Sequence, residues 1–319
     1  MKAGIKKNIR KRFRHCGIYG ARSNYAQVFY YQVAEGKKDK RANMAKWRRK
    51  YEVAIPRNKE FNNKRSIRFF EALVESNYAE DDLLLSLDYN DANLPSNEQE
   101  AKMKVKRYIQ KVNYYLKKQG KENAKWILVT EIGAKGRIHH HLLIKCDLDR
   151  DILEKLWIIK NANAKGENIE KRGTANSSRL RPGEREGLLR LINYIAKEYR
   201  DRTDGKPHSR RKWECSQNLI RPWETINDHP RMMSKKKFNK MKELPEDCED
   251  MKKIIEGDNP GYELINMEKT YIEELGQWFF FCRLRLSTTA RKPADKSVDK
   301  KTKGEVCPKL PRGQTAQKS

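Results

Sequence analysis

The chain has 319 residues, enough for one large domain or two smaller ones. Its 71 Lys and Arg residues exceed its 43 Asp and Glu residues and leave a formal net charge of +28. This charge predicts a polyanionic partner, with nucleic acid ahead of an anionic membrane surface. The chain shows no apolar run of ~18 residues, no signal-peptide pattern and no CxxC pair. We therefore expect a cytoplasmic protein with reduced thiols and no membrane partner.

Residues 1–62 form a basic N-terminal extension whose fold the pattern does not predict. Residues 1–15 hold seven Lys and Arg and no acid, which favours a mobile arm that contacts phosphate. Residues 25–33 favour a strand because aromatic and β-branched side chains dominate them. Residues 63–77 have an apolar stripe at helical spacing and predict a helix.

Two strong elements follow. Residues 82–89, DLLLSLDY, predict a short buried strand because the apolar run is too short for a helix. Ser96 then caps a long helix, with Gln99 as its capping-box partner, and Gly120 ends it. The side chains predicted to be buried along this helix are Ala101, Val105, Tyr108, Ile109, Val112, Tyr115 and Leu116.

Residues 126–145 predict a β-hairpin with Gly133 and Gly136 in its turn. The later elements are a helix over 148–158, a loop over 160–181 that can hold an irregular strand, a helix over 184–199, an extended segment over 211–220 and a strand over 278–286. The order strand, helix, strand, strand, helix predicts an α+β fold. We expect a ferredoxin-like, RRM-like antiparallel sheet with helices on one face.

Composition and the order of predicted elements suggest domain bounds after residue 62. We assign the ferredoxin-like domain to residues 63–222 and a C-terminal accessory region, which could pack on that core, to residues 223–290. Residues 291–319 are rich in Pro, Lys, Ser, Thr and Gly and are expected to be a disordered basic tail.

The second arm of the hairpin carries three consecutive histidines. Strand alternation directs His139 and His141 to one face and His140 to the other. Glu131 on the first arm joins the pair only if an odd-length loop, which a glycine bulge allows, places it opposite His139. A symmetric turn would instead pair it with Ile138. Two imidazoles and a carboxylate suit Mn²⁺ or Mg²⁺ when the substrate is a phosphate, and structural packing is the alternative role.

The predicted helix over 184–199 offers a nucleophile. Tyr194 lies off its apolar stripe, with Lys197 three residues further on the same side. A phenol with its ordinary pKa near ~10 attacks more readily when an ammonium group and a metal-bound phosphate favour the phenolate. A surface tyrosine without function is the alternative. Tyr199 belongs to the apolar stripe and is a poor second nucleophile.

These motifs resemble the HUH endonucleases, in particular the rolling-circle replication initiators of plasmids, bacteriophages and related replicons. The matching segments are LLLSLDY at 83–89, GRIHHHL at 136–142 and YIAK at 194–197. Their order and spacing fit over about residues 63–220. One departure is His140, which stands where the family usually has an apolar residue.

The resemblance implies metal-dependent tyrosine transesterification. The enzyme would nick single-stranded DNA at an origin, stay joined to the 5′ phosphate through Tyr194, and later rejoin the strand. His139, His141 and Glu131 would hold the metal, and Lys197 would assist. A single usable tyrosine fits the plasmid-type initiators. Because no G-x-x-x-x-G-K-[ST] motif occurs, no fused helicase is expected. The resemblance implies a bacterial host cell whose helicase and DNA polymerase are the expected partners.

Two alternatives remain open. A relaxase or single-tyrosine transposase would use the same chemistry, although relaxases usually place the tyrosine before the histidines and such transposases are generally shorter. A non-catalytic nucleic-acid-binding module would explain the charge and the aromatic residues. It would not explain a His-x-His motif followed by Tyr-x-x-Lys.

Overall fold

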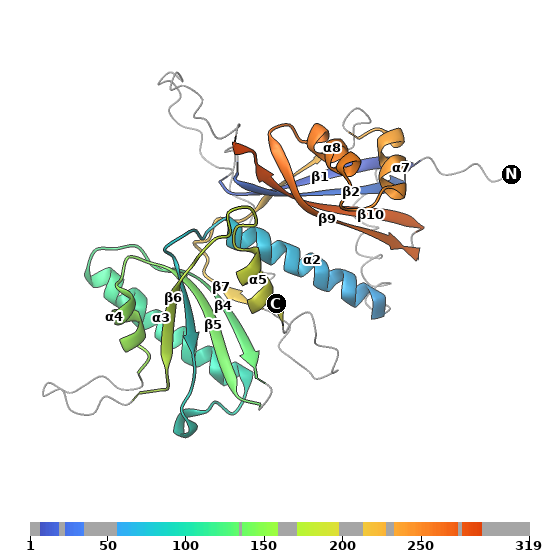
Figure 1. Cartoon of the computed structure of the whole chain (residues 1–319). Helices are drawn as coiled ribbons and strands as arrows, with labels where there is room; N and C mark the ends of the chain where they lie inside the picture. Colours follow the sequence, from blue (N-terminus) through green and yellow to red (C-terminus); the bar gives the residue numbers. More distant parts are fainter. Residues whose placement is uncertain are drawn as a thin grey trace, which may run out of the picture.

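In a computed structural model, the chain forms two antiparallel five-stranded sheets and six α-helices over the residues that the structure describes. Figure 1 shows the two sheets on either side of helix α2 (Pro56–Glu75). The predicted α+β class is confirmed. The described residues are 7–18, 23–34, 56–133, 136–158, 171–197, 213–227, 233–273 and 276–288.

The first sheet, which we call the histidine sheet, has the strand order β6-β3-β5-β4-β7. Every neighbouring pair in it is antiparallel, and β5 lies between β3 and β4. The helix that connects β3 to β4 crosses one face of the sheet, as in a split βαβ unit. The strands are β3 (Leu83–Leu87), β4 (Lys125–Ile132), β5 (Ile138–Lys145), β6 (Ala175–Arg179) and β7 (Glu214–Cys215).

Helices cover both faces of the histidine sheet. On one face, α3 (Glu98–Lys118) and α4 (Arg150–Lys155) pack against Leu85, Leu128 and Leu142. The opposite face packs on α2 and on α5 (Leu189–Ile195). The predicted helices on one face are therefore joined by a second layer, which the sequence pattern did not indicate.

Helix α3 matches its prediction except at one end and at one side chain. Its N-cap is Asn97 and not Ser96, because the Asn97 carboxamide oxygen accepts a hydrogen bond from the Glu100 N–H at 2.9 Å. Gly120, with φ of +69°, lies just beyond its C-terminal end. The predicted buried stripe is confirmed except for Tyr115, which is 39% exposed and contacts a neighbouring tyrosine ring.

The second sheet joins segments from both ends of the chain, so we call it the terminal sheet. Its strand order is β8-β1-β2-β10-β9. Two helices, α7 (Lys235–Glu243) and α8 (Glu249–Asp258), pack on one face through apolar side chains. Helix α2 lies against the other face. The strands are β1 (Lys7–Cys16), β2 (Tyr25–Ala34), β8 (Trp223–Asn227), β9 (Tyr262–Ile272) and β10 (Gln277–Leu286).

The prediction of a mobile basic arm is wrong for residues 7–15, which form β1 between β2 and β8. Acidic groups from distant parts of the chain neutralise its charges. Lys11 Nζ lies 2.8 Å from Asp258 Oδ2, and Arg14 Nε donates to Glu224 Oε1 at 2.8 Å. A local count of charges cannot detect these partners.

Other elements differ in their bounds from the sequence predictions. Of the described residues in the extended segment predicted at 211–220, only the two of β7 form a strand. Strand β6 lies within 160–181, where the prediction allowed an irregular strand. The tail at 291–319 and Tyr199 lie outside the described residues.

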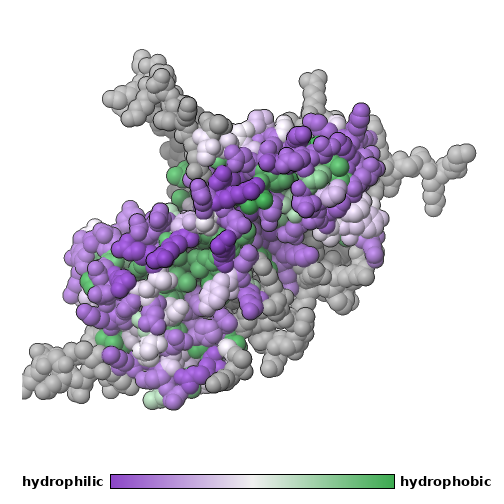
Figure 2. All heavy atoms as spheres, viewed as in Figure 1, coloured by the Kyte–Doolittle hydropathy of each residue, from purple (hydrophilic) through white to green (hydrophobic). Residues whose placement is uncertain are grey.

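None of the described helices has the length and hydropathy needed to cross a membrane. The surface seen in Figure 2 is largely hydrophilic, with smaller apolar areas.

Candidate metal centre and adjoining tyrosine

The register of the β4–β5 hairpin places an acid and two histidines on one face. Glu131 lies opposite His139, and Val129 lies opposite His141. Because directly opposed residues share a face, the Glu131 carboxylate points to the same side as both imidazoles. The predicted odd-length register is confirmed, and the symmetric alternative with Ile138 is not adopted.

Two backbone hydrogen bonds close the end of this hairpin. The Gly133 N–H donates to the Arg137 carbonyl oxygen at 2.8 Å, and the Gly136 N–H donates to the Gly133 carbonyl oxygen at 2.8 Å. Gly136 has φ of +76°, a left-handed conformation that disfavours residues with a Cβ. Arg137 also donates to the Tyr89 carbonyl oxygen at 2.8 Å, so the start of β5 is tied to the end of β3.

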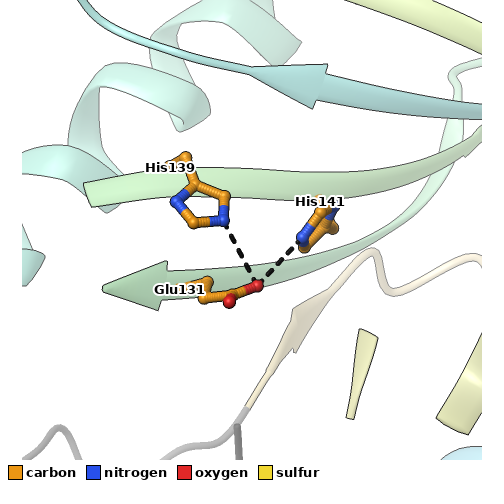
Figure 3. Close-up of side chains that lie close together, drawn as sticks. All are labelled: Glu131, His139 and His141. Atoms are coloured by element: carbon orange, nitrogen blue, oxygen red, sulfur yellow. Dashed lines mark hydrogen bonds and ion pairs between the residues drawn. The ribbon is translucent and has the colours of Figure 1, made fainter. Parts of the chain in front are cut away.

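The three side chains converge on one point (Figure 3). Nε2 of His139 and Nε2 of His141 lie 3.2 and 3.1 Å from Oε2 of Glu131. His141 is 4% exposed, whereas His139 and Glu131 remain 26% and 32% exposed, so the cluster is open on one side. Burial lowers the pKa of His141, although Glu131 opposes this effect. The neutral imidazole, the form that binds metals, is therefore favoured.

The spacing of these atoms fits a metal ion. All three candidate ligand atoms lie within 4.8 Å of one another. Two ligands at right angles, each about 2.1 Å from a cation, would be about 3 Å apart, close to the measured separations. Glu131, His139 and His141 could thus hold one metal ion, with the open side left for substrate. His141 Nδ1 is buried and has no hydrogen-bond partner among the described residues.

His140 is on the opposite face of β5 and is fully buried. Its Nε2 lies 2.9 Å from the Tyr89 hydroxyl oxygen, and its Nδ1 lies 3.0 Å from the Thr130 hydroxyl oxygen. Burial lowers the pKa of His140 to about 3, so the ring is neutral at physiological pH. Both ring nitrogens are engaged away from Glu131, which explains how a polar residue fits a position that faces the core.

Helix α5 brings Tyr194 to the metal centre. The Tyr194 ring is 62% exposed, and its centroid lies 5.4 Å from that of His141 at an interplanar angle of 69°. Ile192 and Ile195 are buried against the sheet, which turns Tyr194 toward the open side. The helix begins at Leu189, five residues later than predicted. Lys197 is exposed, two residues beyond the end of α5.

An acidic residue near the centre was not singled out from the sequence. Asp88 follows β3, and its charge raises the pKa of His141, against the larger effect of burial. The Trp157 indole N–H donates to the Asp88 carbonyl oxygen at 2.8 Å. A Cβ on Gly173 would lie 2.1 Å from the same oxygen, so this segment is closely packed. The position of Asp88 directly after the apolar run in DLLLSLDY is the sequence feature that could have identified it.

The comparisons with known proteins give a family match. The family model described as a replication-associated protein of the ORF2 type matches residues 82–203, the stretch that contains β3, the Glu131, His139 and His141 cluster and Tyr194. No curated protein and no solved structure matches the chain.

Proposed function

We propose that the protein initiates rolling-circle replication by nicking and rejoining single-stranded origin DNA, a proposal supported by the match of residues 82–203 to the family model of a replication-associated protein of the ORF2 type. The observation that carries the proposal is the 5.4 Å approach of Tyr194 to His141, a member of a possible metal centre. We assign the nicking domain to residues 63–222. Host helicase and DNA polymerase would supply unwinding and synthesis.

Glu131, His139 and His141 would hold Mn²⁺ or Mg²⁺, which polarises the scissile phosphate and neutralises charge on its oxygens. Tyr194 is the nucleophile. Its Oη gives its proton to water and attacks phosphorus, and the Tyr O–P bond forms. The bond from phosphorus to the 3′ oxygen breaks, and that oxygen takes a proton from water and leaves as a hydroxyl. Lys197, three residues further along the chain, would assist the attack. Because the phosphotyrosine retains the energy of the broken ester, a returning 3′ hydroxyl can reverse the step without ATP.

Covalent capture tests this chemistry. The full chain is incubated with Mn²⁺ and a labelled origin-derived oligonucleotide, and the products are separated in SDS. We expect an SDS-resistant adduct with the wild type and with Tyr114→Phe, a matched control whose ring is 56% exposed on α3. We expect none with Tyr194→Phe. An adduct of equal yield from Tyr194→Phe would contradict the proposed nucleophile.

A second arm tests the metal centre. His139→Ala and His141→Ala should each abolish the adduct at a Mn²⁺ concentration that saturates the wild type. Unchanged cleavage by both variants would exclude the proposed ligands. Sequencing the DNA end trapped on the protein would separate a replication origin from the transfer origin of a relaxase or the end of a transposon.

A further inference from the structure

The terminal sheet carries aromatic rings on the face opposite α7 and α8. Tyr31 on β2 lies opposite Phe279 on β10, and the rings are stacked with centroids 5.6 Å apart and an interplanar angle of 26°. The next pair on this face is Phe29 and Phe281, with centroids 5.3 Å apart. The Phe29 and Phe281 side chains are buried, whereas Tyr31 and Phe279 are only partly buried. The outer pair is therefore accessible to a ligand.

Arginines surround these rings. Arg12 on β1 lies opposite Phe29, with its guanidinium carbon 5.8 Å from the ring centroid. The guanidinium carbon of Arg68 on α2 lies 4.0 Å from the Phe281 centroid. Arg65, one turn earlier on α2, is exposed. Guanidinium groups beside aromatic faces can stack on bases and pair with phosphates.

The rings and arginines line two adjoining cavities of about 420 and 580 Å³. Both cavities are lined by Arg12, Arg14 and Arg65, and Glu224 is the one carboxylate among their described lining residues. We call these two cavities the aromatic–arginine groove. The groove combines a net positive charge with apolar walls. This combination matches a ligand that has both phosphates and flat apolar faces.

The groove continues toward the tyrosine helix. The 420 Å³ cavity shares Arg68 with another cavity of about 430 Å³. That cavity is also lined by Leu189 and Asn193 of α5, and Asn193 immediately precedes Tyr194. A chain-like ligand could thus follow α2 from the terminal sheet to the helix that carries Tyr194.

We propose that the aromatic–arginine groove is a second binding site for single-stranded DNA, separate from the nicking centre. Bases stack on Tyr31 and Phe279, and the exposed Arg65 contacts phosphates, whereas Arg12 is held by an ion pair with Glu224. A duplex is a poorer ligand because its base faces are stacked internally. The choice of DNA over other single-stranded nucleic acid rests on the proposed function.

Equilibrium binding tests the groove without strand cleavage. Fluorescence anisotropy of a labelled oligodeoxynucleotide of about 20 nucleotides is measured with the full chain in EDTA. We expect Tyr31→Leu and Phe279→Leu each to raise the Kd roughly tenfold through lost base stacking. Arg65→Gln should lower the slope of log K against log salt by about 0.7, the value for one phosphate contact to a single strand.

Matched controls lie on α3, on the far side of the histidine sheet. Tyr114→Leu and Arg107→Gln, both at exposed positions, should leave the Kd unchanged. Circular dichroism verifies that each variant is folded. An oligonucleotide of the same length with abasic sites should bind the wild type more weakly, a result that needs no variant.

Equal binding of intact and abasic oligonucleotides, or wild-type affinity in both ring variants, would overturn the proposal. So would a change of oligomeric state in sedimentation velocity on Tyr31→Leu, because the groove would then be an interface between copies of this chain. The binding result does not depend on nicking, because EDTA prevents strand cleavage. If the wild type forms no covalent adduct but shows the expected binding in EDTA, the nicking proposal alone is contradicted. If the wild type forms the adduct but the ring variants bind as it does, the groove proposal alone is contradicted.

Discussion

Glu75 should make the stability of the fold fall as pH rises toward neutrality. Its side chain is 5% exposed at the end of α2 and accepts hydrogen bonds from Arg283 Nη2 and from the Leu188 N–H, both at 2.9 Å. Burial raises the pKa of Glu75 from 4.5 to about 7, against the opposing effect of Arg283, and the nearby Glu71 raises it further. This carboxyl joins the terminal sheet to the start of the tyrosine helix.

The sign follows from proton linkage. A carboxyl whose pKa is higher in the folded than in the unfolded state holds more protons when folded, so its stabilising contribution is complete below pH 4.5 and is lost as pH rises through about 7. At about 1.4 kcal/mol per pH unit, the loss is at most about 3.5 kcal/mol. Glu75→Gln removes this dependence and keeps an acceptor for Leu188.

The assay is urea unfolding of wild type and Glu75→Gln between pH 5 and pH 8, followed by circular dichroism. Over this range, we expect the free energy of unfolding of the variant to rise by about 1–3 kcal/mol relative to wild type. Glu263→Gln is the control. Ser287 and Arg285 lower the pKa of Glu263, so its effect changes only below pH 4.5. A constant difference for Glu75→Gln, or one that moves against the variant, would show that the buried carboxyl is ionised and refute the reasoning.

Three further predictions concern the histidine sheet. Glu131→Gln should weaken Mn²⁺ binding more than about tenfold in isothermal titration calorimetry, because a direct ligand matters at least as much as its supporting groups. His140→Leu should leave Mn²⁺ affinity unchanged but lower the free energy of unfolding by about 1–3 kcal/mol, since it removes the partner of the Thr130 hydroxyl; a loss of affinity would contradict the assigned face. Gly173→Ala should cost about 1–3 kcal/mol in urea unfolding, because its Cβ would lie 2.1 Å from the Asp88 carbonyl oxygen. Unchanged stability would show that this contact relaxes freely.

Local patterns predicted much of the histidine sheet. The apolar run at 83–87 and the stripe along α3 each reflect a periodicity that reports burial directly. The N-cap was misplaced by one residue because Ser96 and Asn97 are both good caps, and only the backbone geometry distinguishes them.

The terminal sheet was not predictable in this way. Its strand β1 reads as a charged arm, and its neutralising partners Asp258 and Glu224 are more than 200 positions away in sequence. The strands that flank β2 come from opposite ends of the chain. Pairings of such long sequence separation leave no local periodicity to detect.

In the candidate site, too, some features follow from local sequence pattern and others from tertiary contacts. Strand alternation by itself determined that His139 and His141 share a face and that His140 does not, because side chains along a strand alternate strictly. The tertiary structure decided the other two facts. The register of the hairpin brings Glu131 to the two imidazoles, and the packing of α5 on the sheet, with its start bonded to Glu75, brings Tyr194 beside His141. Both depend on contacts between separate elements, and a residue pattern within one element does not encode them.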